Sequence, residues 1–104
     1  MLTGKQRHHL RALAHEMKPV VQIGKSGIDD GVVAAIEKAL ADHELVKVKI
    51  GEGSSLDRHE AADELAASTK SEIAQVVGNT VILYRPDPEE PKIQLPIRTS
   101  ETEA

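Results

Sequence analysis

Positions 20–27 read VVQIGKSG, a short apolar run followed by a Gly-x-x-Gly turn. A helical pattern begins just after the turn, near Asp29, so the stretch predicts a strand, a tight turn and a helix in succession. Glycine has no Cβ and lets a backbone lie close to a ligand. The N–H groups of such a turn and the positive end of the next helix favour an anion. Lys25 adds a cation at the tip, and the turn therefore suits a phosphodiester chain.

The P-loop of NTPases also joins a strand to a helix through Gly-Lys-Ser. That motif needs another glycine five positions before the glycine that precedes the lysine, and here the position holds Pro19. The loop is also too short to wrap a triphosphate, so the motif is not a nucleotide-hydrolysing one. A strand-to-helix turn that binds nothing stays an open alternative, because a lone Gly-x-x-Gly is a weak signal.

Composition limits the class of protein further. The 104 residues form one domain with a small core, and the absence of cysteine excludes a disulfide framework. No apolar run approaches the ~18 residues of a membrane span, and there is no signal-peptide core, which predicts a cytoplasmic protein. Tyr84 is the only aromatic residue. Single-strand binders usually stack bases on several aromatic rings, so an RRM-type platform is excluded. If the protein binds nucleic acid, it must recognise phosphates, 2′-hydroxyls and the shape of the molecule.

Charge is distributed unevenly in a chain whose formal net charge is −4. Residues 1–28 hold five basic residues and one acidic residue, whereas the remainder holds eight basic and sixteen acidic residues. The five basic residues are Lys5, Arg7, Arg11, Lys18 and Lys25. A basic segment that ends at the glycine turn is typical of a local phosphate footprint. The same number of basic residues could also be ordinary charged residues on the solvent side of a helix, and this alternative to a phosphate-binding role stays open.

The first helix is predicted to begin at Thr3, which has capping-box spacing to Gln6, and to end before Pro19. Its expected buried stripe is Leu10, Leu13, Ala14 and Met17. Asp29 or Asp30 is expected to cap the second helix, whose core face is Val32, Ile36, Ala39 and Leu40. These aspartates partly cancel the positive helix end, so the loop N–H groups and Lys25 would carry most of an anion contact.

A third helix is expected from Ser54 or Ser55, since Ser54 has capping-box spacing to Asp57. Its apolar face is mostly small, with Leu56, Ala61, Ala62, Leu65 and Ala66. Its outward side is acidic, with Asp57, Glu60, Asp63 and Glu64, and is not expected to meet RNA.

Residues 45–50 alternate between apolar residues and lysines, which predicts a strand with one wet, positive face at Lys47 and Lys49. Residues 73–77 and 80–84 flank Gly78-Asn79 and predict a hairpin, with Tyr84 packed in the core or at an edge. Residues 92–95 are a possible short extended piece, and residues 98–104 an acidic, frayed tail. The order α-β-α-β-α-β-β predicts a small mixed four-stranded sheet covered by helices, with two right-handed crossovers that each give parallel pairing.

Four segments together resemble a CRM domain, the RNA-binding module named for chloroplast RNA splicing and ribosome maturation, and most of all its stand-alone bacterial YhbY-type members. The segments are LTGKQRHHLRALAH (2–15), KPVVQIGKSGI (18–28), HELVKVKI (43–50) and VVGNTVILYRP (76–86). The resemblance implies a domain over residues 1–97 with a fold akin to the C-terminal domain of bacterial translation initiation factor three. It also implies a Gly-x-x-Gly loop used on RNA as KH domains use theirs, and an association with precursors of the large ribosomal subunit.

By position in the matching segments, the resemblance assigns Gly24, Lys25, Ser26 and Gly27 to the RNA loop. It adds basic positions at Lys18, Lys47, Lys49 and Arg85, beside Lys5, Arg7 and Arg11 of the first helix. One departure is residues 68–71, which lack the glycine expected where the third helix stops.

The residues predict a non-catalytic, monomeric RNA-binding protein with no cofactor, small-molecule substrate or membrane partner, and the resemblance implies that its target is ribosomal RNA of large-subunit precursors. The alternative is a protein-interaction module on the ribosome that acts through the acidic third helix. A nucleotide enzyme is a third class, for which no convincing catalytic group is found. His8 and His15 lie about two helical turns apart, too far to share one metal ion without further ligands.

Overall fold

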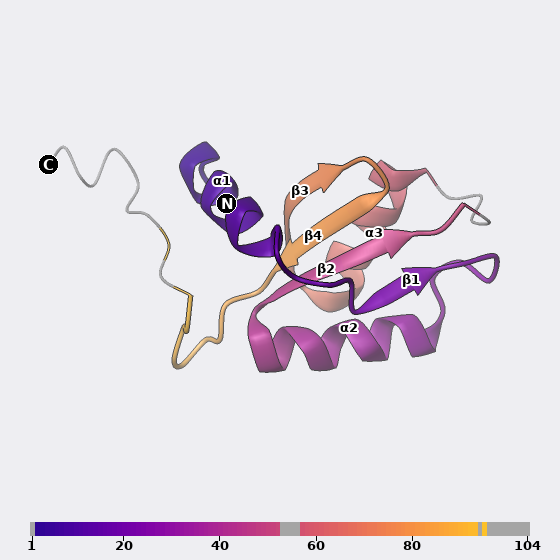
Figure 1. Ribbon diagram of the computed structural model, residues 1–104. Coiled ribbons are helices and arrows are strands. Elements are labelled where there is room, and N and C mark those ends of the chain that lie inside the picture. The colour runs from indigo at the N-terminus through magenta and orange to yellow at the C-terminus, as the bar shows by residue number, and fades with distance from the viewer. Residues whose placement is uncertain (1, 53–56, 94, 96–104) are drawn as a thin grey trace, which may run out of the picture.

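The computed structural model describes residues 2–52, 57–93 and 95 (Figure 1). Within these ranges the chain forms α1 (Gly4–Ala14), β1 (Val21–Ile23), α2 (Asp30–His43), β2 (Leu45–Ile50), α3 (Arg58–Thr69), β3 (Glu72–Val77) and β4 (Thr80–Tyr84). This confirms the predicted α/β element order. The predicted domain end at residue 97 and the tail at 98–104 lie outside the described residues.

The sheet is mixed and four-stranded, with the order β1-β2-β4-β3. β1 is parallel to β2, as expected for the crossover through α2, while β4 is antiparallel to both β2 and β3. Direct parallel pairing across the second crossover was a wrong prediction. The connection through α3 carries β3 one position beyond β2, and β4 fills the place between them.

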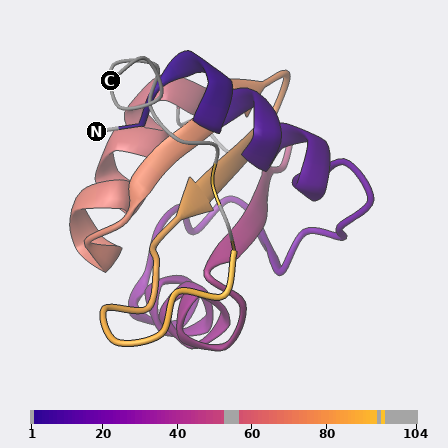
Figure 2. The same ribbon diagram turned by 90° about the vertical axis from the view of Figure 1, so that its left-hand side faces the viewer.

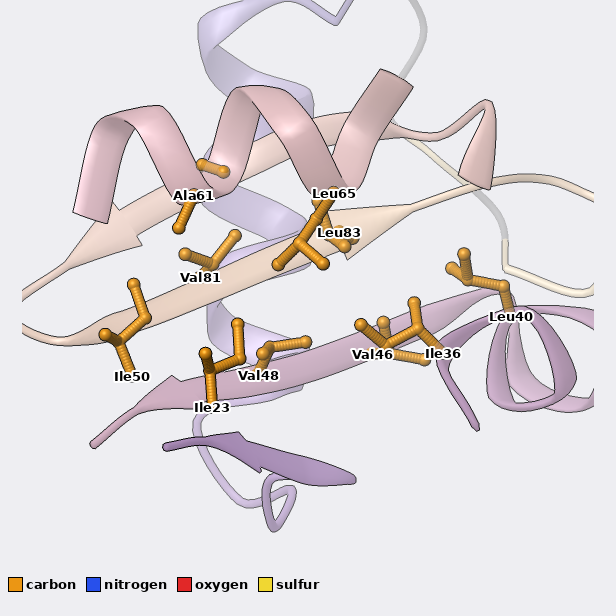
Figure 3. Close-up of a cluster of buried hydrophobic side chains, with 11 residues drawn as sticks. Ile23, Ile36, Leu40, Val46, Val48, Ile50, Ala61, Leu65, Val81 and Leu83 are labelled. Atoms are coloured by element: carbon orange, nitrogen blue, oxygen red, sulfur yellow. The ribbon is translucent and has the colours of Figure 1, made fainter. Parts of the chain in front are cut away.

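Alternating side chains divide the sheet into two faces, with α2 and α3 on one side and α1 on the other (Figure 2). The larger core fills the α2–α3 side (Figure 3). It includes Ile23, Ile36, Leu40, Val46, Val48, Leu65, Val81 and Leu83. On the other side, α1 packs Leu10 and Ala14 against Leu45, Ile82 and Tyr84. Tyr84 is 3% exposed, which confirms its predicted place in the core.

The N-terminal caps follow the sequence at α1 and α2, but α1 ends at Ala14 with His15 as its C-cap, so the predicted helix end at Pro19 is wrong. Thr3 and Gln6 form the expected capping box, with bonds of 2.9 and 3.1 Å. The Asp29 carboxylate accepts from the Val32 N–H at 2.8 Å and caps α2. α3 begins later than predicted, at Arg58, because Asp57 is its N-cap and accepts from the N–H groups of His59 and Glu60. Ser54, Ser55 and Leu56 lie outside the described residues.

α3 stops without a glycine. Lys70 takes the left-handed conformation, with φ 53°, and the Ser71 N–H bonds the Ala66 carbonyl at 3.0 Å. A left-handed conformation costs a non-glycine residue on the order of 1 kcal/mol. The hydrogen bonds that close the helix end offset that cost. α3 therefore ends at the expected place although the glycine is missing.

One predicted core residue of α1 is on the surface: Leu13 is 43% exposed. α1 is the single helix described on its side of the sheet and buries only Leu10 and Ala14, a narrow i, i+4 contact. Leu13 falls on the flank of that contact and lines a shallow hollow with Met17 and Val20. The predicted four-residue stripe is therefore wrong at Leu13.

Glu44, which the sequence analysis did not single out, organises the C-terminal segment. It ends α2 with φ 66° and is 1% exposed. Its carboxylate accepts from the N–H groups of Asp87, Lys92 and Ile93 at 2.6, 2.8 and 2.8 Å. Burial alone would raise the pKa of the Glu44 carboxyl, but these three N–H groups and the charge of Lys92 hold that pKa below its ordinary value.

The bonds to Glu44 fix residues 87–93, whereas the extended piece expected at residues 92–95 falls partly outside the described residues. Within the described residues 85–93 the chain forms no strand, and it passes the C-terminal end of α2 (Figure 1). Regular structure is not required to fix this segment, because one buried carboxylate satisfies three of its backbone donors.

Candidate nucleic-acid interface

The glycine turn is exposed. It follows the carboxyl end of β1 and lies at the right-hand end of the ribbon in Figure 1. The Gly27 N–H donates to the Gly24 carbonyl at 3.0 Å and closes the turn, and Gly27 has φ 69°, which favours glycine. Lys25 and Ser26 are exposed. Among the described residues, nothing accepts a hydrogen bond from their backbone N–H groups.

The fold does not require glycine at position 24. A Cβ built at this position has no heavy atom within 4 Å, and its φ is not in the left-handed region. The fold itself would accept a side chain here. The bare backbone is thus open surface into which a ligand can approach closely.

The N-terminus of α2 adds little to anion binding at this turn. Asp29 already accepts from the first turn of the helix, and Asp30 adds a second carboxylate there. Negative side chains offset the positive end of a helix. An anion contact at this turn would therefore have to come from Lys25 and from the backbone N–H groups that have no acceptor in the described chain.

A second glycine holds the base of the turn. The Gly51 N–H donates to the Ile23 carbonyl at 2.8 Å, so the exit of β2 runs against the end of β1. A Cβ at Gly51 would lie 2.7 Å from Gln22 Nε2 and 3.0 Å from the Ile23 carbonyl oxygen. Only a residue without a side chain allows this approach.

Replacing Gly51 by alanine should lower the free energy of unfolding by about 1–3 kcal/mol, the usual cost of overpacking. The Gln22 side chain can move, but the Ile23 carbonyl belongs to the β1–β2 ladder and must shift with it. Urea denaturation measures the change. Gly24→Ala is the matched control and should unfold at the parent's urea concentration, because its Cβ meets nothing. Equal stability of the two variants would contradict the assigned packing at Gly51.

A row of cross-strand neighbours leads from the turn across the sheet. Gln22 pairs with Lys49, Lys49 with Thr80, and Thr80 with Val77. The residues that alternate with them are in the α2–α3 core, so the row lies on the α1 side, beyond the part that α1 covers. Lys49 is exposed, as predicted.

At the end of this row a hollow of about 280 Å³ lies between the C-terminal half of α1 and the β3–β4 hairpin. Arg11 and His15 reach it from α1, Lys47 from β2, and Val77, Thr80 and Ile82 from the hairpin. The structure therefore brings Arg11 and Lys47 together, although they are far apart in sequence.

Lys47 does not belong to a wet strand face, and this part of the prediction is wrong. Leu45, on the same face, is 2% exposed beneath α1. Lys47 is half-buried, and its Nζ donates to the carbonyls of Ala14 and Met17 at 3.3 and 3.4 Å. These carbonyls lie at the end of α1, where a cation is stabilising. Lys47 thus helps to hold α1 on the sheet.

The other predicted basic residues do not form a single patch. Lys5 and Arg7 are exposed on α1, with Arg7 one turn before Arg11. Lys18 precedes β1, at the opposite end of that strand from the glycine turn, beside the hollow that contains Leu13. Arg85 lies on the α2–α3 side: its Nη1 donates to Glu37 Oε2 at 2.9 Å and to the Thr69 carbonyl at 2.8 Å. It links α2 to the end of α3.

The described residues offer little else for chemistry. They contain no group of three or more histidine or acidic side chains placed to hold a metal ion. None of the helices in these ranges is long and apolar enough to cross a membrane. The acidic residues of α3 that fall in the described ranges, Asp57, Glu60, Asp63 and Glu64, are all exposed, as predicted.

Comparison with known proteins gives one consistent result. The model of the CRS1 / YhbY (CRM) domain family matches residues 2–85. "Probable RNA-binding protein YqeI" of Bacillus subtilis is 38% identical over 96 residues, which are 92% of this chain and 100% of that protein. A Haemophilus influenzae protein named "RNA-binding protein" is 42% identical over 95 residues, 91% of this chain and 95% of that one. The solution structure of SAV1595 from Staphylococcus aureus is 42% identical, has a TM-score of 0.77, and aligns with 92% of this chain and 100% of its own.

Proposed function

Because this chain belongs to the CRS1 / YhbY (CRM) domain family, we propose that it is a non-catalytic RNA-binding protein that acts as a monomer in the cytoplasm. Relatives that match over nearly their whole length are named as RNA-binding proteins, which supports RNA as the ligand. The proposed target is ribosomal RNA in precursors of the large subunit, and the resemblance of the four matching segments to YhbY-type proteins supports it.

The observation that carries the proposal is the exposed glycine turn. It combines a cation at Lys25, two backbone N–H groups without acceptors in the described chain, and a glycine at position 24 that the fold does not require. The contact surface we propose starts at residues 24–27. It continues through Lys49 to Arg11, with Arg7 and Lys5 further along α1. Lys18 and Arg85 lie outside this surface.

Replacing Gly24 by alanine should weaken RNA binding several-fold while the Tm stays at the parent's value. The added Cβ would occupy the space of the RNA backbone without touching the protein. Fluorescence anisotropy with a fragment of precursor ribosomal RNA measures the affinity. With about 4–6 phosphate contacts, the parent's log affinity should fall against log salt with a slope of roughly −3 to −4 on single-stranded RNA. A slope near zero, or parental affinity in Gly24→Ala, would count against the turn as the RNA site.

A protein-interaction role is the competing function, and the exposed acidic side of α3 favours it. The two functions differ in one simple observation on isolated subunits. RNase digestion should release the protein if RNA holds it, and should leave it bound if α3 contacts a ribosomal protein.

A further inference from the structure

We infer that the hollow between α1 and the β3–β4 hairpin binds one unpaired base, and that it prefers the keto bases uracil and guanine to cytosine and adenine. This inference rests on the proposed RNA-binding function and deepens it. The glycine turn and the lysines meet phosphates, which carry no sequence information. The hollow is the place on the same surface where a base can be read.

The size and floor of the hollow suit a base. Its volume of about 280 Å³ is just below the range of small-molecule pockets, roughly 300–1,000 Å³, which leaves room for one base rather than a stack. Ile82 is 4% exposed at the floor, and Val77 is 39% exposed at the wall. An unstacked base can bury its apolar faces against these two side chains.

Planar side chains at the rim replace the aromatic platform that the chain lacks. Tyr84, the only aromatic ring, is buried under α1 and cannot stack on RNA. Arg11 and His15 are exposed at the hollow, one turn apart on α1. A guanidinium and an imidazole both stack on unpaired bases.

The polar groups around the hollow are mostly donors. Arg11 presents N–H groups only, and Lys47 keeps one of its three N–H groups after its bonds to the carbonyls of Ala14 and Met17. No carboxylate is among the described residues that line it. Guanine offers the acceptors O6 and N7, and uracil offers O4, whereas adenine and cytosine place an amino donor at the same edge. The Thr80 hydroxyl can accept one bond, so the discrimination between keto and amino bases is expected to be modest.

The hollow is also in reach of the phosphate contacts. Val77 and Thr80 line it and belong to the row that begins at Gln22, beside the glycine turn. Lys49 lies in the middle of that row. A strand of RNA held at Lys25 and Lys49 would therefore place a base near Arg11.

The test uses single-stranded oligomers of equal length and charge that differ only in base identity. Uridine-to-cytidine and guanosine-to-adenosine replacements at one position should each weaken binding to the parent protein by about 3- to 10-fold, the effect of one or two hydrogen bonds. Arg11→Lys keeps the charge but loses the planar guanidinium. In this variant the ratio of affinities, uridine over cytidine and guanosine over adenosine, should fall to about 1. The matched control is Arg85→Lys, because Arg85 lies on the opposite, α2–α3 side of the sheet, and this variant should keep the parental ratio. Equal binding of all four bases to the parent would overturn the inference.

A second measurement separates this inference from the proposed function. Uridine 5′-monophosphate, added to labelled protein, should shift the NMR signals of Val77, Thr80 and Ile82, and cytidine 5′-monophosphate should shift them less. If RNA binding with a steep salt slope is found but neither the base preference nor these shifts, the base site is wrong and the phosphate surface stands. If the mononucleotide shifts occur without RNA binding, the hollow binds a base and the proposed function fails.

Discussion

Lys25→Asp combined with Ser26→Asp should weaken RNA binding at least about tenfold at 0.1 M salt, which equals about 1.4 kcal/mol. The change turns the cation at the tip of the glycine turn into two anions, beside the carboxylates of Asp29 and Asp30. Repulsion of the phosphates should also make the log–log salt slope shallower by about 1. Both residues are exposed, so the free energy of unfolding should be nearly unchanged. Anisotropy titrations at three salt concentrations measure both effects.

The matched control changes the net charge of the protein by the same amount as Lys25→Asp with Ser26→Asp, but on another surface. Ala34 and Lys38 are exposed one turn apart on α2, outside the proposed RNA surface. Ala34→Asp with Lys38→Asp should keep at least most of the parental affinity. If the two double variants lose the same affinity, net charge rather than the glycine turn governs binding.

Glu44→Ala should lower the free energy of unfolding by about 2–4 kcal/mol. Three backbone N–H groups lose their charged acceptor, and bonds to charged groups contribute roughly 1.5–3 kcal/mol each, reduced here because residues 87–93 can open to water. Guanidinium denaturation measures the loss. Hydrogen exchange should show that the amides of Asp87, Lys92 and Ile93 lose protection. Glu64→Ala, at an exposed glutamate of α3, should be close to neutral.

The pH dependence of stability gives a second readout for Glu44. Its pKa in the folded protein is below the ordinary value of 4.5. Its contribution is therefore fully present above about pH 4.5 and is lost as the pH falls through the folded pKa. Between pH 5 and pH 3 the parent should lose more stability than Glu44→Gln, which keeps an amide oxygen as acceptor but has no charge to lose. An identical acid dependence of the two proteins would show that this carboxylate does not carry the effect.

Sequence alone predicts the elements here because local signals agree with the fold. The capping box of Thr3, the cap at Asp29 and the alternation of residues 45–50 each appear where the sequence places them. The glycine turn is likewise a local feature, and its exposure follows from polar residues between a strand and a helix. These features require only neighbours in sequence, which a pattern can report.

Features that depend on distant partners were not predictable in the same way. Lys47 and Lys49 look equivalent in sequence, and only the position of α1 separates the half-buried one from the exposed one. Arg85 belongs to a matching family segment, but it lies on the α2–α3 side of the sheet, where it bonds Glu37 and the Thr69 carbonyl. Glu44 has no motif at all, since its three donors come from more than forty residues further along the chain.

The position of β4 in the sheet has a consequence for synthesis of the protein. β4 is the last described strand to be made, yet it separates β2 from β3 and supplies the pairing partner of both. Until it has emerged, the nascent chain has only the short β1–β2 pair, and a two-stranded sheet is marginal in water. The four-stranded sheet can therefore be completed only late, after nearly all of the described chain has been translated.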